Sequence, residues 1–217
     1  FCGSMIYKVE RGGYHIVDGQ QRMITSMIFI SALRDITEIY KDLYKDEGKE
    51  INQIYLDMIS NLTQCLGNKG FGETKLKPRV TVGKIIKKTF QEIVLSNRGW
   101  IHKQTIPIAS KKSKTEQNIV RNYRYIYSGL DDYIKNDISN GVLPNKSIQN
   151  IFKSFTKIHF IKIEVESDRK AYEVFITVNS KNDPLTSFDL TKTLIFKEID
   201  ATLDEDNKWA EMEKNIN

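Results

Sequence analysis

The stretch IVDGQQRMITSMIFISALRDI, residues 16–36, places a short polar cluster between a β-prone run and a long apolar segment. Apolar residues recur at spacings of three and four from residue 23 to about residue 44, which predicts a helix. This helix is nearly apolar all round in its first half, so we expect its start to be buried. An acid, a glycine, two amides and an arginine therefore crowd the point where a strand becomes a helix.

Two short β-prone runs precede this point, at residues 5–9 and 14–17. Gly12 and Gly13 lie between them and can supply the positive φ that a tight hairpin turn needs. We therefore predict two paired strands that lead directly into residues 18–22.

The rest of the chain reads as mainly helical. Periodicity predicts four more helices, at residues 51–66, 83–96, 117–138 and about 188–199. Residues 157–165 alternate and are rich in β-branched side chains, so they predict a strand; Ser167 or Asp168 can cap a helix after it. Residues 97–114 are polar, basic and irregular, and we expect them to be mobile or completed by a partner.

The predicted fold class is α+β, with a small β-sheet followed by a mainly helical bundle. We predict a single domain over residues 1–217, with three approximate parts: a hairpin and motif helix at 1–44, a helical region at 45–156, and a strand with C-terminal helices at 157–217. With 217 residues, 40% of them hydrophobic, the chain is long enough for one good-sized domain or two small ones.

The net charge and the cysteines indicate which partners and which cellular compartment to expect. A net charge of +5 and a pI of about 9.0 suit an anionic partner such as a nucleotide or nucleic acid, although ordinary proteins often share this excess. The two cysteines stand in no Cys-x-x-Cys or Cys/His cluster, so no zinc site is indicated and a cytoplasmic location is expected. No apolar run reaches the roughly 18 to 20 residues that span a bilayer, so no membrane partner is predicted.

The polar cluster has the chemistry of an anion site. Residues 19–22 fall on the predicted helix N-terminus, where unpaired N–H groups and the positive end of the dipole attract an anion. Gly19 lets the backbone approach a phosphate closely, and Arg22 can hold phosphate oxygens in a two-pronged contact. Asp18 would repel a bare phosphate. It fits better as a metal ligand, a base that orients water, or a partner that fixes Arg22.

The residues alone leave a second interpretation open, in which Asp18 only caps the helix and Arg22 pairs with it. Other phosphate and catalytic signatures are missing: the sequence has no G-x-x-x-x-G-K-[ST], no G-x-G-x-x-G after a strand, and no H-E-x-x-H. The pattern therefore supports a phosphate site and a structural corner about equally.

Two motifs resemble a known family. IVDGQQRMITSMIFISAL closely resembles the DGQQR signature of the N-terminal domain of GmrSD-type restriction enzymes, which are modification-dependent (type IV) and whose domain is related to the ParB and sulfiredoxin fold. FITVNSKNDPLTSFDLTK, residues 175–192, resembles a second family pattern of Phe, Asn-Ser-Arg-Gly, Leu and Asp-Leu. FCGSMIYKV and NYRYIYSGL fit the family's first strand and central helix, so the resemblance covers nearly the whole chain.

The resemblance implies a domain that binds and hydrolyses a nucleoside triphosphate to control a nuclease that attacks modified phage DNA. The implied nucleotide-binding residues are Asp18, Gly19, Gln20, Gln21, Arg22 and, one turn further on, Thr25. Asp18 and Arg22 are the candidate catalytic residues, and Asp18 is the candidate ligand for a Mg²⁺ ion. The implied partners are a nucleotide of unknown base, modified DNA, and an HNH-type nuclease domain or subunit.

The second motif implies site-shaping roles for Asn179, Leu185 and Asp189. The chain departs from the family where Lys181 and Asn182 replace the usual Arg-Gly. Asn tolerates a left-handed backbone, but Lys lacks the fork geometry of Arg. The family's usual segment ahead of the first strand and its HNH-type half are missing, so we expect a fragment and predict no DNA cleavage by these residues.

Two other functions stay open. A ParB-like nucleic-acid-binding module would use nucleotide as a switch without turnover, and the basic segment at residues 98–114 favours it. An α+β interaction protein would use DGQQR only as a structural corner. A salt titration of DNA affinity tests the ParB-like module, since a shallow slope with no dependence on nucleotide would count against it. Unchanged nucleotide turnover and binding in both Asp18→Ala and Arg22→Ala would count against the NTPase.

Overall fold

The computed structural model describes residues 3–69, 76–96, 103 and 113–179. The chain forms two compact units: one contains residues 1–20 and 158–217, and the other contains residues 21–157. Each unit has its own apolar core.

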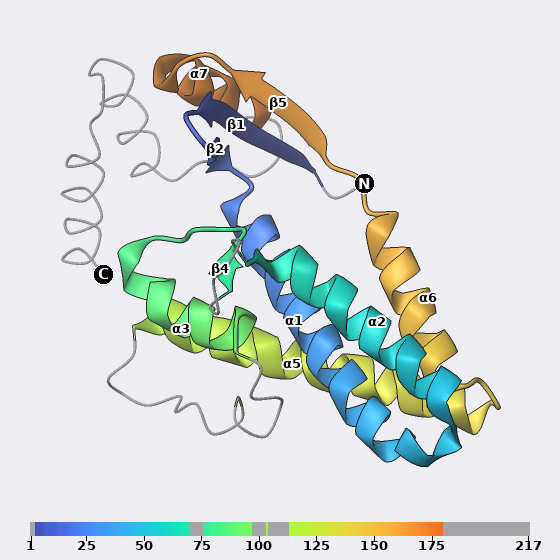
Figure 1. The fold of residues 1–217 in the computed structure, drawn as a ribbon. Coiled ribbons are helices and arrows are strands. Elements are labelled where there is room, and N and C mark those ends of the chain that lie inside the picture. The colour runs from blue at the N-terminus through green and yellow to red at the C-terminus, as the bar shows by residue number, and fades with distance from the viewer. Residues whose placement is uncertain (1–2, 70–75, 97–102, 104–112, 180–217) are drawn as a thin grey trace. The chain divides into compact units, whose positions relative to one another are not determined.

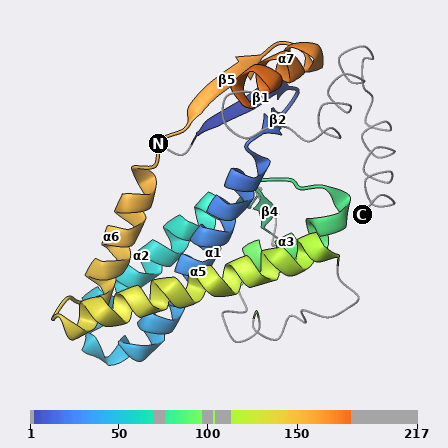
Figure 2. The same cartoon turned by 180° about the vertical axis from the view of Figure 1, so that it is seen from behind.

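The first unit holds a three-stranded sheet with the order β2-β1-β5. Its strands are β1 (Ser4–Glu10), β2 (Gly13–Asp18) and β5 (Ile161–Val165). β1 runs antiparallel to β2 and parallel to β5. α7 (Asp168–Asn179) packs on β1 and β5, as Figures 1 and 2 show.

The core of this unit lies between α7 and the sheet. Ile6 and Ala171 are fully buried there, with Val174 and Phe175 packed against them. Ser167 caps α7, because its Oγ accepts a hydrogen bond from the backbone N–H of Lys170 at 3.3 Å. The predicted helix start after residue 166 is therefore confirmed.

The second unit is a helical bundle (Figures 1 and 2). Its elements are α1 (Gln20–Leu43), the short 3-10 helix η1 (Lys45–Glu47), α2 (Lys49–Leu66), the paired strands β3 (Gly67–Asn68) and β4 (Lys77–Pro78), α3 (Lys84–Val94), α5 (Lys114–Ser139) and α6 (Pro144–Thr156). α5 packs against both α3 and α6. Among the described residues of this unit, α1, α2, α3, α5 and α6 each contribute buried apolar side chains to one core.

Local chemistry explains where α5 begins. Ser113 Oγ accepts from the N–H of Glu116 at 3.3 Å, and the Glu116 carboxylate accepts from the N–H of Ser113 at 3.0 Å. This capping box satisfies two backbone donors that the helix would otherwise leave open. The helix therefore starts at Lys114, earlier than apolar periodicity alone predicts.

The fold class is α+β with a helical part, as predicted, but four details differ. The sheet is not simply followed by the bundle, since its third strand, β5, comes after the bundle in the chain. The strand predicted over 157–165 is confirmed only for Ile161–Val165, because α6 continues to Thr156 and Lys157 forms its C-cap. In the confirmed hairpin, Gly12 has φ of +92° but Gly13 does not have a positive φ.

The fourth difference concerns α1. Its buried positions lie between Met27 and Tyr40, whereas residues 20–26 are exposed or half-buried, so the prediction that its start is buried is wrong. Apolar spacing shows which face is suited to burial, but the packing of neighbouring helices decides which turns are covered. The predicted helix at residues 188–199 lies outside the described residues. Residues 97–112 also lie outside the described residues, except for Lys103, which is buried.

Candidate functional site

The DGQQR segment forms a strand-to-helix corner. β2 ends at Asp18, and α1 begins at Gln20. Gly19 links them with φ of +91°, in a region that residues with a side chain rarely adopt. The first turn of α1 contains no acidic residue, so none there offsets the positive end of its dipole. The predicted placement of residues 19–22 at a helix N-terminus is thus confirmed.

The first glutamine has a structural task in this corner. Gln20 Nε2 donates a hydrogen bond to the carbonyl oxygen of Ile16 at 2.8 Å. This bond ties the first residue of α1 back to β2 and uses one of the two amide protons of Gln20. The second amide proton of Gln20 is left to donate a hydrogen bond to a ligand.

The other predicted ligand-binding residues differ in exposure. Gln21 and Thr25 are exposed, and Asp18 and Arg22 are half-buried. Gln21 and Thr25 are four residues apart in α1, so they lie on the same face of the helix. Two neutral donors are therefore available to solvent at the start of α1.

The second motif is described only at its start. Asn179 is the last residue of α7, and its side chain lies outside the described part of the structure, as do Leu185 and Asp189 entirely. Their predicted site-shaping roles therefore stay predictions.

The positive φ of Gly19 gives a stability prediction. We expect Gly19→Ala to lower the free energy of unfolding by about 1–3 kcal/mol, because alanine is strained at this backbone angle. Gly129→Ala is the matched control, since Gly129 lies inside α5 and a Cβ there meets no atom within 4 Å. The control should stabilise the chain by about 0.4–1 kcal/mol. Urea unfolding of both variants measures the difference, and equal stabilities would contradict the requirement for glycine.

A second polar group, not predicted from the sequence, lies inside the bundle. Asp35 of α1 is fully buried, and its Oδ1 accepts from Arg34 Nε at 3.2 Å and Nη2 at 3.0 Å. Its Oδ2 accepts from Lys103 Nζ and from the hydroxyl of Tyr123. Lys103 Nζ also donates to Ser31 Oγ at 3.1 Å. We call these five residues the Asp35 cluster.

The cluster also ties α1 to the C-terminal end of α3. Arg34 donates to the carbonyl oxygens of Val94 at 3.1 Å and Ser96 at 2.8 Å. Ser31 Oγ donates to the carbonyl oxygen of Ile93 at 2.7 Å. These bonds satisfy carbonyl groups that lack partners at a helix end, so the cluster acts as a C-terminal cap made of side chains from another helix.

Burial shifts the pKa values of two members of the cluster, Lys103 and Tyr123. It lowers the pKa of Lys103 to about 8, with the charge of Arg34 acting in the same direction and that of Asp35 opposing it. Burial and the neighbouring Asp35 raise the pKa of Tyr123. Burial, with Asp35 next, also raises the pKa of the half-buried Glu38. All five members of the cluster are buried, which suits a structural network better than a catalytic site.

The sequence carried only a partial signal for this cluster. Ser31, Arg34 and Asp35 are spaced i, i+3 and i+4 within an otherwise apolar run, which places three polar side chains on one face of a helix. Charged residues in such a run are rarely buried unless they are paired. The identity of the partners, Lys103 and Tyr123, was not readable, because they are 68 and 88 residues away from Asp35.

Comparison with known sequences identifies the family. The profile described as GmrSD restriction endonuclease, N-terminal domain, matches residues 1–196. The chain belongs to the GmrSD N-terminal-domain family. No curated protein matches the chain.

The GmrSD family gives the domain a role in a type IV restriction system, a form of phage defence, and implies DNA and a nuclease domain or subunit as partners. Among the described residues of this GmrSD domain, no three His, Cys, Asp or Glu side chains are grouped to hold a metal ion. Within the same residues, no helix is both long and apolar enough to cross a membrane.

Proposed function

We propose that this GmrSD domain binds the phosphates of a nucleoside triphosphate at the N-terminus of α1 and hydrolyses the nucleotide to control a DNA nuclease. The corner at Gly19 is the observation that carries the proposal. Its positive φ leads the chain into a helix whose first turn has no acid, and such a terminus offers N–H groups and a positive dipole end to an anion.

Each side chain has a role in this proposal. Arg22 holds phosphate oxygens through its planar fork, and Gln21 and Thr25 donate hydrogen bonds from the exposed face of α1. Asp18 is the only acidic residue between residues 11 and 34, so it is the one candidate there to orient the attacking water. The base of the nucleotide is left open, because these residues address only its phosphates.

A Mg²⁺ ion is compatible with this corner. Mg²⁺ at nucleotide sites is usually held by one or two carboxylates together with phosphate oxygens and waters. The carboxylate of Asp18 suits that coordination, although no three-ligand group is present in the described residues. When bound, the ion would neutralise phosphate charge.

Nucleotide binding and turnover by the full-length protein test the proposal. We expect Arg22→Gln to raise the Kd for a nucleoside triphosphate about 10- to 100-fold, the value of a charged hydrogen bond. We expect Asp18→Asn to lower kcat about 100-fold or more, the usual contribution of a proton-transfer or water-orienting group. Its nucleotide affinity should be kept or increased, since a negative charge beside the phosphates is removed.

Arg11→Gln and Asp42→Asn are the matched controls, because both residues are exposed and lie outside residues 18–25. Wild-type kinetics in Asp18→Asn and Arg22→Gln together would overturn the site. Tight binding by the wild-type protein with no turnover would instead favour the ParB-like switch, which binds nucleotide without using it as fuel.

A further inference from the structure

Basic residues are concentrated around α3. The described residues 76–96 contain five of them, Lys77, Arg79, Lys84, Lys87 and Lys88. Glu92 is the only acid in the same span. This span therefore carries +4, while the whole chain carries +5. The rest of the chain sums to +1, and it includes a second basic run at residues 98–114.

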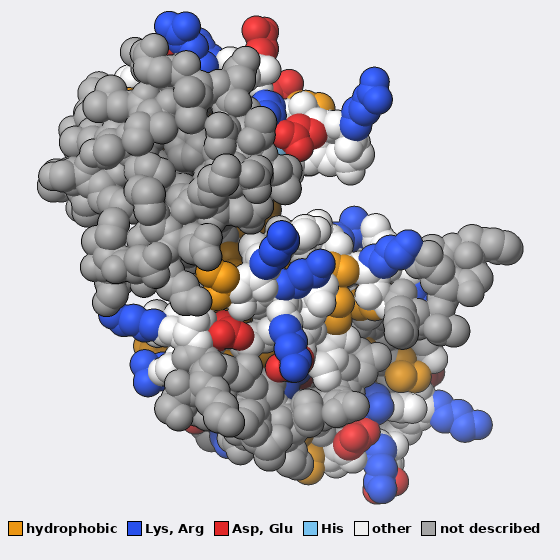
Figure 3. All heavy atoms as spheres, turned by 90° about the vertical axis from the view of Figure 1, so that its left-hand side faces the viewer, with side chains coloured by type: hydrophobic (Ala, Val, Ile, Leu, Met, Phe, Trp, Pro, Cys, Tyr) orange, Lys and Arg blue, Asp and Glu red, His pale blue; other side chains and the backbone are white. Residues whose placement is uncertain are grey.

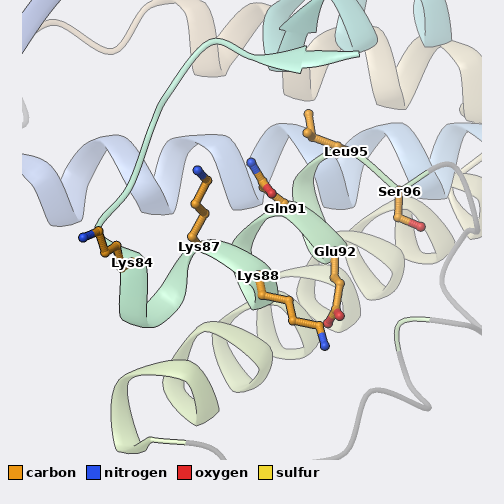
Figure 4. A pocket seen from close by; sticks show the side chains of 7 residues that line it. All are labelled: Lys84, Lys87, Lys88, Gln91, Glu92, Leu95 and Ser96. Atoms are coloured by element: carbon orange, nitrogen blue, oxygen red, sulfur yellow. The ribbon is translucent and has the colours of Figure 1, made fainter. Parts of the chain in front are cut away.

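Three of these lysines line one open cleft. Lys84, Lys87 and Lys88 are exposed and border a cleft of about 550 Å³ on α3. Gln91, Ser96 and one acid, Glu92, contribute the other polar groups of its lining, as Figure 4 shows. In the same view Lys87 and Gln91 extend on one side of the helix, and Lys88 extends beside Glu92.

The opposite face of α3 is fixed in the bundle. Phe90, Ile93 and Val94 are fully buried there, so the helix holds its basic face in a defined position. The first turn of α3 has no acidic residue, and its dipole adds positive potential at the same end. Figure 3 faces the left-hand side of Figure 1, and on this face Lys and Arg side chains are interspersed with Asp and Glu side chains.

The spacing of the lysines suits a nucleic acid strand. With a rise of about 1.5 Å per residue, Lys84 and Lys88 are about 6 Å apart along the helix axis. A DNA strand carries one phosphate per about 3.4 Å of its axis, so this row of lysines spans about two phosphates. The cleft is shallow and rimmed by long flexible cations, which suits contact with a phosphate backbone and not with base edges.

We propose that the face of α3 formed by Lys84, Lys87 and Lys88 binds the phosphate backbone of double-stranded DNA. The inference rests on the DNA partner in the proposed function and is independent of nucleotide hydrolysis at residues 18–22. Lysines that neutralise phosphates release counterions, so this contact makes DNA affinity depend on salt.

A salt titration tests the proposal. The full-length protein and its Lys84→Gln/Lys87→Gln/Lys88→Gln variant are titrated onto an unmodified DNA duplex at several salt concentrations. We expect the variant to bind at least about 10-fold more weakly at low salt. The slope of log affinity against log salt should become shallower by about 2–3, close to one unit per lost phosphate contact.

A second triple variant, Lys49→Gln/Lys146→Gln/Lys153→Gln, removes the same charge from exposed positions on α2 and α6. It should change the slope by less than about one unit. Equal losses in the two triple variants, wild-type binding by the α3 variant, or no DNA binding by the wild-type protein would each overturn the assignment. The assignment would also be overturned if the α3 variant lost binding to anionic-lipid vesicles while it kept the wild-type affinity for DNA. Nucleotide turnover of the α3 variant should stay at the wild-type level, which separates this proposal from the nucleotide site.

Discussion

We expect Asp35→Asn to lower the free energy of unfolding by about 3–5 kcal/mol, the usual cost of removing one partner from a buried ion pair. Asp35 is the only carboxylate that directly contacts Arg34 and Lys103 among the described residues, and both cations are fully buried. Asparagine keeps the size of the side chain but removes its charge. Two buried cations would then lack a counter-charge, and the Tyr123 hydroxyl would lose a charged acceptor.

Asp42→Asn is the matched control for this change. Asp42 lies on the same helix, but its side chain is 75% exposed and its ion pair with Lys41, at 3.3 Å, faces solvent. Exposed ion pairs contribute little, so the control should change stability by less than about 1 kcal/mol. Chemical denaturation followed by circular dichroism measures both variants. A loss for Asp35→Asn as small as that of the control would mean that the cluster does not hold the bundle together.

The expected loss is large because the cluster joins α1 to the end of α3, to Lys103 and to α5. Arg34 and Ser31 bind carbonyl groups at the end of α3, and Asp35 binds Tyr123 on α5. Disrupting Asp35 therefore weakens contacts of α1 with two other helices at once. Single deletions in such networks are not additive, so double variants with Tyr123→Phe should lose less than the sum of the two single losses.

Local features of the fold were readable from the sequence because their causes are local. Gly12 sits in a two-strand turn, and Gly19 separates a β-branched run from a helical one, so both the hairpin and the corner could be placed. The chemistry of a helix N-terminus follows from the same few residues. The corner could thus be located from residues 16–22 alone, and the structure places it at the predicted position in the chain. That this corner binds an anion stays a prediction.

Long-range features were not readable in the same way. β5 pairs with β1 through partners such as Ser4 and Ile161, and nothing in either segment specifies the other. Tyr123 fits its helix as an ordinary apolar residue, yet its hydroxyl binds Asp35. Lys103 lies in a polar, basic segment whose composition predicts that it is mobile or completed by a partner, but its ammonium group is buried. Each case depends on what the folded chain brings nearby, which periodicity does not encode.

The low pKa of Lys103 predicts an unusual dependence of stability on pH. Its pKa is about 8 in the folded chain, against an ordinary value of 10.5. Between these values the unfolded chain binds more protons than the folded chain, so the free energy of unfolding rises with pH. Each pKa unit is worth about 1.4 kcal/mol, so the rise in the free energy of unfolding from pH 8 to pH 10 is about 2 kcal/mol. Below about pH 7 Lys103 is charged in both states, so it no longer makes the free energy of unfolding depend on pH.

Buried tyrosines limit the rise in the free energy of unfolding at higher pH. The pKa of Tyr55 is raised to about 12, mainly by burial, and that of Tyr123 is raised as well. Above about pH 10 these groups ionise first in the unfolded chain. The folded chain then holds more protons, and the free energy of unfolding falls as pH increases further. Stability should therefore reach a maximum near pH 10.

Urea unfolding from pH 7 to pH 11, with wild type, Lys103→Met and Lys146→Met, measures this curve. Lys103→Met should remove the rise between pH 8 and pH 10, whatever its effect at pH 7, because the titrating group is gone. Lys146→Met should keep the rise, since Lys146 is exposed and lies outside the cluster. A flat wild-type curve over this range would show that Lys103 titrates alike in both states. An unchanged rise in Lys103→Met would assign the effect to another group. The expected pattern would identify Lys103 as a buried ammonium group whose desolvation cost disappears when it loses its proton at alkaline pH. The bundle is then most stable at a pH at which most surface lysines are still charged.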